Sequence, residues 1–389
     1  MKIGILTLPL SNNYGGILQA YALQTACERM GHNVEVVKWK SYEFNGYPFY
    51  KAFFIYGKRL FLGREIKVEK RLKEENRIKY QKIHDSIGRM IHYSKETISD
   101  RKQLIDYIDS SKFDVLVVGS DQVWRKTYGN DGSFFRTFFP TKPFPSTDTF
   151  FLDFLSELSY KPKSIAYAAS FGVDYMEYNN KEIEKYGKFI ESFQLVSTRE
   201  EHGIVLVKDS YRWNCNPKWV LDPTFLLDKQ DYQSIMNCSK QTTSPYTLFY
   251  VLDETDEKTD FANRVSKELS IPLKTISLNS HDRKKKGQAL PSVEEWLSLF
   301  LNAEYIVTDS YHGTVFAIIF KKPFYVIGNK KRGLARFHSL LSFFKLENRM
   351  VDERGKLSNI NIDWNFVSLH IDNEKAKCID MLCSVIKQN

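Results

Sequence analysis

The stretch AEYIVTDSYHGTVFAIIFKKPFYV, residues 303–326, decides the fold of this chain. Its apolar start ends in a polar turn at residues 308–314, and a second apolar segment follows at once. The pattern predicts a strand, a turn and a helix, and Lys322-Pro323 ends that helix before another strand at residues 324–327. Because turns that follow the strands of a parallel sheet lie at its carboxyl edge, where ligands bind, this turn is a candidate site.

The side chains of this turn suit an anionic ligand. Free backbone N–H groups at a helix N-terminus attract anions, and four polar residues are expected there: Asp309, Ser310, His312 and Thr314. Gly313 would let a ligand approach the backbone closely. A lone histidine is more often a surface residue or a hydrogen-bonded core residue, but the position of His312 at a strand end favours a site.

Composition narrows the class of protein. A chain of 389 residues exceeds what one core organises, so we expect two domains. Hydrophobic residues make up 42% and aromatic residues 14%, which argues against disorder. The net charge of +9 suggests an anionic ligand or surface. Nucleic acid is not favoured, because the sequence has no zinc pattern, RNP-like signature or arginine-rich arm.

Five widely spaced cysteines without a CxxC pair indicate reduced thiols rather than a disulfide framework. Histidines and acids show no metal-ligand spacing, so no metal site is predicted. The first ten residues are interpreted as a buried strand rather than a signal peptide, and no stretch has the length of a transmembrane helix. We therefore expect a cytoplasmic protein, and peripheral association with the inner membrane surface stays open.

The first forty residues predict a βαβ unit with a glycine-rich loop between its first strand and its helix. The loop contains no GxGxxG motif, and no acidic residue ends the second strand, which argues against NAD binding. The loop suits an anionic or sugar ligand, although its asparagines are equally compatible with a tight turn that caps the helix. The loop residues concerned are Asn12, Asn13, Tyr14, Gly15 and Gly16.

We predict an α/β protein with two Rossmann-like domains. The N-terminal domain is expected over residues 1–204, with a helical and aromatic insertion at 41–110, and the C-terminal domain over 205–372. Residues 373–389 predict a separate amphipathic helix. The carboxyl edges of the two sheets would face each other across a cleft.

Other strand ends carry polar residues that suit chemistry. Asp121, between Ser120 and Gln122, follows an apolar strand, and Arg199 follows another. Candidate acids and bases are Asp121, Asp309 and His312, and candidate anion holders are Arg199, Arg332 and Arg336. A nucleophilic serine is poorly supported because GxSxG is missing. A cation-rich cleft with one histidine suits transfer from a phosphorylated donor, where charge stabilisation supplies most of the rate.

The order of the segments NNYGGILQAYAL, VGSDQVW, SFG, STREEHG, LDPT, TDSYHGTVFAIIFKKPF and KRGLARFHSLL resembles the polysaccharide pyruvyl transferase family over nearly the whole chain. The resemblance implies a glycosyltransferase-B-like architecture and phosphoenolpyruvate as donor, with no further cofactor. It also implies a sugar or lipid-linked oligosaccharide as acceptor. The usual product is a pyruvate ketal on a hexose of a cell-surface polysaccharide or its lipid-linked precursor.

The resemblance also assigns roles to residues. His312 matches the histidine of the family's donor pocket, and Arg199 matches an arginine that faces the donor. Several members carry an arginine where this chain has Ser310, so we hypothesise that Arg332 or Arg336 supplies the missing charge. His312 would be the acid or a phosphate ligand.

Asp121 or Asp309 would be the base for the acceptor hydroxyl, although each carboxylate is equally compatible with a structural role. The remaining predicted substrate contacts lie beside these residues: Asn12, Asn13, Tyr14, Gly15, Gly16, Ser120, Gln122, Ser310, Tyr311, Gly313 and Thr314.

Two other classes of protein stay open. One is a glycosyltransferase that uses a nucleotide sugar on the same architecture, although the C-terminal half shows no acidic residue placed to hold a ribose. The other is a catalytically degenerate member that binds a sugar or an anion, in which Ser310 would reflect lost catalysis.

Overall fold

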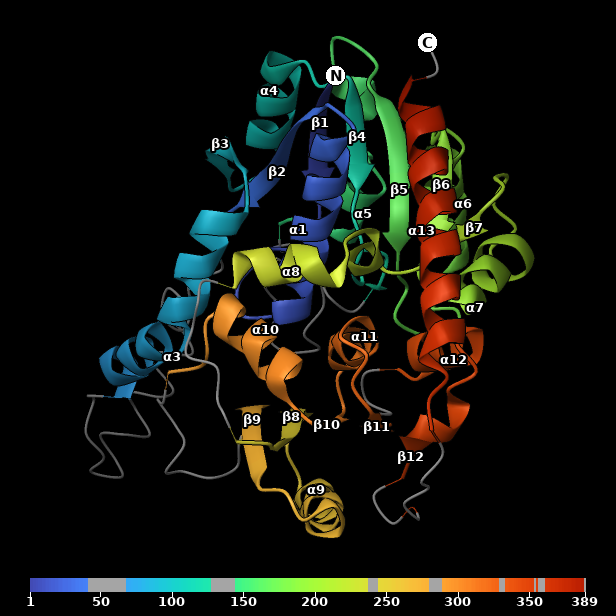
Figure 1. Cartoon of the computed structure of the whole chain (residues 1–389). Coiled ribbons are helices and arrows are strands. Elements are labelled where there is room, and N and C mark those ends of the chain that lie inside the picture. Colours follow the sequence, from blue (N-terminus) through green and yellow to red (C-terminus); the bar gives the residue numbers. More distant parts are fainter. Residues whose placement is uncertain are drawn as a thin grey trace, which may run out of the picture.

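The computed structural model describes residues 1–40, 68–126, 144–236, 244–279, 289–328, 333–352, 355 and 361–387. In this part of the chain, one parallel sheet lies above a second in Figure 1, and helices cover their faces. We call the two layered assemblies the first unit and the second unit. Their parallel sheets confirm the predicted α/β fold class with two Rossmann-like units.

The first sheet has the strand order of dinucleotide-binding folds. Its order is β3-β2-β1-β4-β5-β6-β7, so β1 to β6 follow the doubly wound arrangement 3-2-1-4-5-6. Both faces are covered, which is why β4 is apolar throughout: Val115 and Val117 enter one buried cluster, and Leu116 and Val118 enter another. The strands are β1 (Lys2–Leu6), β2 (Asn33–Trp39), β3 (Tyr93–Ile98), β4 (Val115–Val118), β5 (Lys163–Ala169), β6 (Leu195–Thr198) and β7 (Lys218–Trp219).

The helices of the first unit include the last helix of the chain. Figure 1 shows α13 beside the strands of the first sheet, and Lys163 on β5 donates a hydrogen bond to the carbonyl of Ile386 at 2.7 Å. The helical elements are α1 (Tyr14–Arg29), α3 (Val68–Met90), α4 (Arg101–Ser111), α5 (Thr147–Phe150), η3 (Leu155–Glu157), α6 (Asn180–Ile190), α7 (Glu201–Val205), η4 (Leu206–Ser210), η5 (Pro223–Leu226), α8 (Lys229–Ile235) and α13 (Trp364–Lys387).

The second sheet is also doubly wound. Its order, β12-β11-β10-β8-β9, becomes 5-4-3-1-2 when its strands are counted along the chain. The strands are β8 (Thr247–Asp253), β9 (Leu273–Asn279), β10 (Tyr305–Thr308), β11 (Phe324–Ile327) and β12 (Met350–Val351). The helical elements are α9 (Asp256–Leu269), α10 (Val293–Asn302), α11 (Tyr311–Ile319), α12 (Ala335–Phe343) and η8 (Glu347–Arg349). The elements β10, α11 and β11 are the strand, helix and strand predicted from residues 303–326.

One apolar cluster extends through both units. It contains Ile5 from the first sheet together with Leu248 and Ile306 from the second. Tyr14, at the start of α1, is fully buried, and its ring stacks on Trp296 of α10 with ring centroids 5.2 Å apart. Its hydroxyl donates a hydrogen bond to the carbonyl of Pro291 at 2.6 Å. Tyr14, predicted to contact substrate, therefore packs the two units together.

The extent of the first unit differs from the predicted boundaries. The sheet continues past residue 204, because β7 pairs with β6. The last helix starts at Trp364 rather than at residue 373. Within the predicted insertion, residues 41–67 lie outside the described residues, while α3, β3 and α4 complete the first unit. The sequence YSKETI of β3 is mostly polar because β3 is an edge strand, which hides it from a search for apolar runs.

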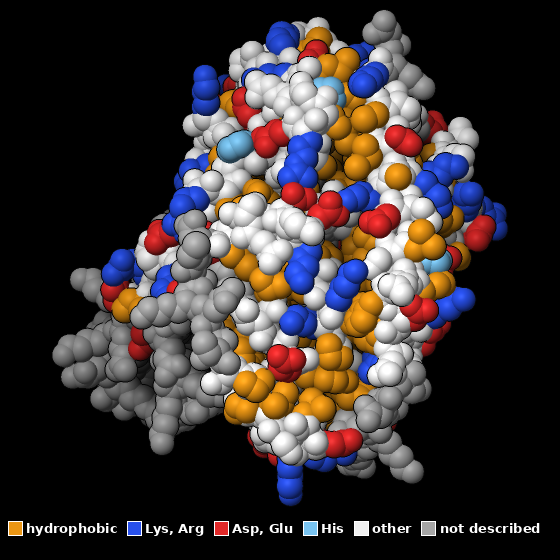
Figure 2. All heavy atoms as spheres, viewed as in Figure 1, with side chains coloured by type: hydrophobic (Ala, Val, Ile, Leu, Met, Phe, Trp, Pro, Cys, Tyr) orange, Lys and Arg blue, Asp and Glu red, His pale blue; other side chains and the backbone are white. Residues whose placement is uncertain are grey.

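Among the described residues on the face that Figure 2 presents, basic side chains do not gather in a single patch. Lysine and arginine side chains are scattered there among aspartate and glutamate. Of the helices in the described residues, none combines the length and the apolar character needed to cross a membrane.

Candidate active site where the two units meet

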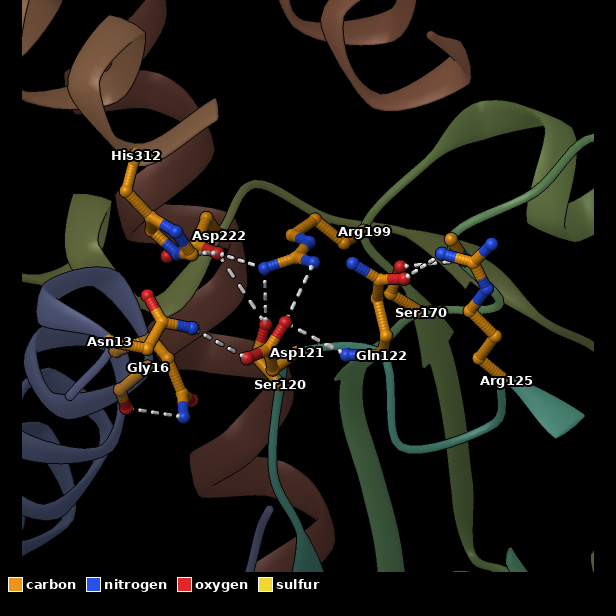
Figure 3. Close-up of polar contacts among 12 residues, drawn as sticks. Asn13, Gly16, Ser120, Asp121, Gln122, Arg125, Ser170, Arg199, Asp222 and His312 are labelled. Atoms are coloured by element: carbon orange, nitrogen blue, oxygen red, sulfur yellow. Dashed lines mark hydrogen bonds and ion pairs between the residues drawn. The ribbon is translucent and has the colours of Figure 1, made fainter. Parts of the chain in front are cut away.

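Polar residues from several strand ends converge in Figure 3. Ser120, Asp121 and Gln122 follow β4, Arg199 follows β6, and Asp222 follows β7. His312 comes from the second unit, at the start of α11. Because the strands of each sheet are parallel, these turns lie at carboxyl edges, as the sequence predicted.

The starts of α1 and α11 meet at Gly15 and His312. A Cβ atom on Gly15 would lie 1.9 Å from Nδ1 of His312, so the imidazole occupies the space that any other side chain would need. Both helices direct their free N–H groups and the positive ends of their dipoles toward this contact. The contact is therefore electropositive as well as tightly packed.

Ser310 caps the helix that carries His312. Its hydroxyl accepts a hydrogen bond from the N–H of Gly313 at 3.2 Å, and its carbonyl accepts one from the hydroxyl of Thr314 at 3.1 Å. A Cβ on Gly313 would lie 2.5 Å from the hydroxyl of Thr308, so glycine is needed here as well. The contacts of Ser310, Gly313 and Thr314 thus fix the start of α11, and His312, which is 6% exposed, is held at its second position.

Asp222 is a fully buried carboxylate that touches both units. Its Oδ1 accepts hydrogen bonds from the backbone N–H and the hydroxyl of Thr224, at 3.0 and 2.8 Å. Its Oδ2 accepts one from Arg199 Nη1 at 2.8 Å and lies 3.4 Å from Nε2 of His312. Burial acts to raise the pKa of Asp222, but the charges of His312 and Arg199 outweigh it and hold that pKa well below its usual range.

Asp222 was not predicted as a functional residue, although its segment, LDPT, is one of those that resemble the family. The signal available was the strand-end position itself, which Asp222 shares with Asp121 and Arg199. The strand before it, β7, has only two residues and is therefore barely visible in the sequence.

Arg199 is the central cation of the site, and its side chain is fully buried. Besides its hydrogen bond to Asp222, it lies 3.4 Å from the hydroxyl of Ser120 and 3.6 Å from Oδ1 of Asp121. Burial alone would lower the pKa of Arg199, but the neighbouring carboxylates, Asp222 first, raise it, so the guanidinium stays charged. Its Nε makes no hydrogen bond within the described residues.

Arg336 lies beside the same site. Its guanidinium is over the ring of Tyr311 at 5.4 Å, and the guanidinium of Arg199 is over that ring at 4.8 Å. The structure thus brings Arg336 close to the position where the sequence lacks an arginine, Ser310. The other candidate for this charge, Arg332, lies outside the described residues.

Asp121 faces Nη2 of Arg199, whereas Asp222 faces Nη1 (Figure 3). Its Oδ1 accepts the N–H of Gln122 at 2.9 Å, and its Oδ2 is 3.4 Å from the amide nitrogen of Asn13. The backbone of Asp121 has φ +78°, a conformation that costs energy for a residue other than glycine. Its carbonyl accepts the N–H of Ser170 at 3.1 Å, which holds this conformation in place.

The other predicted loop residues differ in how close they lie to this network. A Cβ on Gly16 would be 3.5 Å from Oδ2 of Asp121, so Gly16 adjoins it. Gln122 accepts a hydrogen bond from Arg125 at 2.8 Å and turns toward Gly172 rather than toward His312. Asn12 is exposed and accepts a hydrogen bond from Ser11 at 3.0 Å.

Asp309 faces β8 and α9, whereas His312 faces Asp222. Its carboxylate accepts the N–H groups of Leu252 and Asp253, at 2.6 and 3.2 Å, and pairs with Lys258 at 2.7 Å. These contacts favour a structural role, and its predicted role as a base remains untested. Within the described ranges, no group of three His, Cys, Asp or Glu side chains is arranged to hold a metal ion.

The model of one protein family, described as polysaccharide pyruvyl transferase, matches residues 13–331. The chain belongs to the polysaccharide pyruvyl transferase family. The match includes the network from Asn13 to His312, and it ends just before Arg336. The predicted family is thereby confirmed, and the family is one of transferases.

Three solved structures resemble this pyruvyl transferase family member at low sequence identity. A search of curated proteins finds no match. Among solved structures, UDP-GlcNAc 2-epimerase from Methanocaldococcus jannaschii is 12% identical with a TM-score of 0.49, over 96% of this chain and 92% of that one. MurG from Acinetobacter baumannii is 8% identical with a TM-score of 0.44, over 98% and 99%. Spinosyn rhamnosyltransferase SpnG, complexed with thymidine diphosphate, is 10% identical with a TM-score of 0.42, over 99% and 96%.

Proposed function

We propose that this protein transfers the pyruvate group of phosphoenolpyruvate to two hydroxyls of a sugar, forming a cyclic ketal. The observation that carries the proposal is the buried contact of Asp222 with both His312 and Arg199, next to the starts of α1 and α11. This contact combines an acid–base group with fixed positive charge, and the reaction needs both. The acceptor would be a hexose of a cell-surface polysaccharide or of its lipid-linked precursor.

Positive charge would hold the donor. Phosphoenolpyruvate carries a phosphate and a carboxylate, and arginine binds both groups through paired N–H donors. Arg199 has a buried Nε without a hydrogen-bond partner among the described residues, and the two helix starts add free N–H groups. Arg336, whose guanidinium also lies over the ring of Tyr311, would supply the charge that Ser310 cannot.

His312 would deliver the proton that starts the reaction. Protonation of the donor's C3 turns its CH₂ into CH₃ and makes C2 an oxocarbenium-like centre, which a sugar hydroxyl attacks. The second hydroxyl then attacks C2, and the C2–O bond to phosphate breaks with its electrons leaving on phosphate. Of the two hydroxyl protons, one restores the acid and the other leaves with phosphate or solvent.

Asp121 is the better placed of the two predicted bases. It lies 3.6 Å from Arg199 and 3.4 Å from Asn13, so its carboxylate belongs to the network around His312. A sugar hydroxyl near Asn13 would have both a hydrogen-bond partner and a base within reach. Phosphoenolpyruvate would be the only cosubstrate, and no other cofactor enters this scheme.

The net charge of +9 fits an anionic, membrane-linked acceptor used at the cytoplasmic face of a membrane. This location is part of the proposal. The aromatic segment at residues 42–62, which suggested a glycolipid acceptor, lies outside the described residues.

The test is incubation of the full chain with phosphoenolpyruvate and a panel of acceptor glycosides, read out as pyruvylated product by mass and as phosphate release. A thermal-shift panel run alongside compares phosphoenolpyruvate with UDP- and GDP-sugars, because a ligand that binds the native state raises Tm. We expect stabilisation by phosphoenolpyruvate and a ketal product. Transfer of a sugar from a nucleotide sugar would overturn the proposal, and so would binding of phosphoenolpyruvate without transfer to any acceptor.

A further inference from the structure

We propose that Asp222 is a positioning residue, which fixes the imidazole of His312 and the guanidinium of Arg199 through a single carboxylate oxygen. The effect on transfer rests on the proposed function, whereas the effect on the two side chains does not. The segment LDPT, which contains Asp222, resembles the family, but the resemblance assigns no role to this aspartate. Asp222 contacts both Arg199 and His312.

The two oxygens of Asp222 have separate partners. Oδ1 accepts two hydrogen bonds from Thr224, which prevent the carboxylate from rotating. Oδ2 is thereby directed at Arg199 Nη1, 2.8 Å away, and at His312 Nε2, 3.4 Å away. The hydroxyl of Ser120 donates a hydrogen bond to the same oxygen at 3.5 Å and is a third polar neighbour of it. The geometry of Oδ2 is therefore set by the backbone at Thr224 and not by its cationic partners.

The position of Asp222 in the chain strengthens this anchoring. It caps η5, whose first residue is Pro223, and η5 packs against α1 and α13. Proline fixes its own φ and restricts the residue before it, so the backbone that carries Asp222 is rigid. The contact with His312 crosses from the first unit to the second. A carboxylate held by one unit thus determines the orientation of a histidine held by the other.

The contact decides which ring nitrogen of His312 carries a proton. The carboxylate oxygen lies 3.4 Å from Nε2, outside hydrogen-bond geometry, so its negative charge rather than a formed hydrogen bond favours a hydrogen on that nitrogen. The aspartate of a Ser-His-Asp triad fixes the tautomer of its histidine in a comparable way. Nδ1 then remains as the nitrogen that faces the start of α1, next to Gly15. An anionic donor attracted to that helix start would meet Nδ1. When the ring also takes up a proton on Nδ1, the imidazolium directs that proton at the donor, and Asp222 opposite Nε2 balances its charge.

The charges around Asp222 agree with this assignment. Arg199 faces Oδ2 of Asp222 with a charged guanidinium. Burial, with the charge of Asp222 as a further cause, raises the pKa of three phenols, those of Tyr167, Tyr232 and Tyr311, so these phenols stay neutral. The carboxylate therefore keeps its charge opposite Arg199 and Nε2 of His312.

The test is Asp222→Asn. The amide oxygen keeps the two hydrogen bonds from Thr224, so the amide nitrogen takes the place of Oδ2 and sets a donor against Arg199 and His312. In ¹⁵N spectra of labelled full-length protein, with the ring signals assigned through His312→Gln, we expect a proton on Nε2 in the native protein. In Asp222→Asn the proton should move to Nδ1. The same variant should lower kcat by about 10²- to 10⁴-fold.

Asp153→Asn is the matched control. Asp153 is a largely buried carboxylate that pairs with Arg101 at 2.6 Å, outside the network of Asp222. We expect it to lower Tm while the His312 signals and kcat stay as in the native protein. A native ring without a proton on Nε2, or an Asp222→Asn protein with the native tautomer and native kcat, would overturn the inference.

A second variant keeps the inference testable if Asp222→Asn does not fold. Thr224→Val removes one hydrogen bond to Oδ1 and leaves the charge of Asp222, so the proton should stay on Nε2 while kcat falls by less than in Asp222→Asn. An unchanged kcat in an active enzyme would contradict the anchoring role. If the native protein transfers nothing from phosphoenolpyruvate, the proposed function fails, but the ring spectra still decide whether Asp222 fixes His312.

Discussion

Asp222 and Asp309 are both buried aspartates that follow a strand of a parallel sheet, one in each unit. Asp309 accepts two backbone N–H groups and pairs with Lys258, so its partners hold β8, β10 and α9 together. Asp222 faces Arg199 and His312, two groups that can carry charge to a ligand. The difference teaches that two carboxylates at equivalent sheet edges can have different tasks: Asp309 joins secondary-structure elements, whereas Asp222 joins polar side chains of the candidate site.

The largest expected effect concerns His312, the partner of Asp222. His312→Gln removes the proposed acid but keeps a side chain of similar length, so kcat should fall by about 10²- to 10⁴-fold. Steady-state kinetics with phosphoenolpyruvate measure this, and circular dichroism checks that the fold is intact. Retained activity in a folded variant would contradict the role of His312.

Lys258→Met tests the structural role of Asp309 by removing its ion-pair partner. Lys258 is 6% exposed, and its loss leaves a buried carboxylate with an uncompensated charge, which costs about 3–5 kcal/mol. Urea denaturation should show this loss of stability, while kcat per folded molecule stays near the native value. Lys267→Ala, at an exposed position of the same helix, is the control and should be nearly neutral. A fall in kcat without a loss of stability would contradict the structural role and indicate that Asp309 takes part in catalysis.

Arg336→Ala tests whether Arg336 helps to bind phosphoenolpyruvate. Charge-assisted hydrogen bonds contribute about 1.5–3 kcal/mol, so the KM for phosphoenolpyruvate should rise by roughly 10- to 100-fold. Arg349→Ala is matched, because Arg349 is also buried and lies 6.0 Å over the ring of a tyrosine, Tyr325. It should reduce stability without changing this KM. An unchanged KM in Arg336→Ala would rule out Arg336 as the replacement for the missing arginine.

The smallest expected effect concerns stability against pH. Because the pKa of Asp222 is lower in the folded protein than in the unfolded chain, its stabilising contribution is complete above the unfolded value of about 4. It is lost as the pH falls further toward the folded value, with a slope of at most about 1.4 kcal/mol per pH unit. The free energy of unfolding of the native protein should therefore fall more steeply below about pH 4 than that of Asp222→Asn. Parallel curves in urea titrations at pH 6 and pH 3 would contradict this.

Much of the fold follows from the sequence, because strands buried on both faces appear as apolar runs. This holds for β4 and β10 and for the helix that begins at Tyr311. The edge strand β3 alternates poorly, and β7 is too short to give a pattern, so the extent of the first unit could not be predicted. Packing between distant segments, such as α13 on β5, leaves no local signal at all.

The candidate site was partly predictable for a related reason. His312, Arg199 and Asp121 stand at strand ends, and the structure brings them to one network. The spacing of residues in the sequence does not predict which way a side chain turns within its loop. Ser310 caps α11, and Asp309 turns back toward β8, although both lie in the same turn as His312. Asp222 joins the network through contacts that only the folded chain creates.

Because α13 returns to the first sheet, the second unit is an insertion within the first. The chain begins in β1, leaves after α8, and comes back with its last helix, so both ends belong to the same unit (Figure 1). Within the described residues, the chain passes from α8 of the first unit to β8 of the second and returns from β12 to α13, so both connections of the second unit lead to the first. A movement of His312 relative to Asp222 would therefore displace the second unit against a unit to which it is joined at both of its ends.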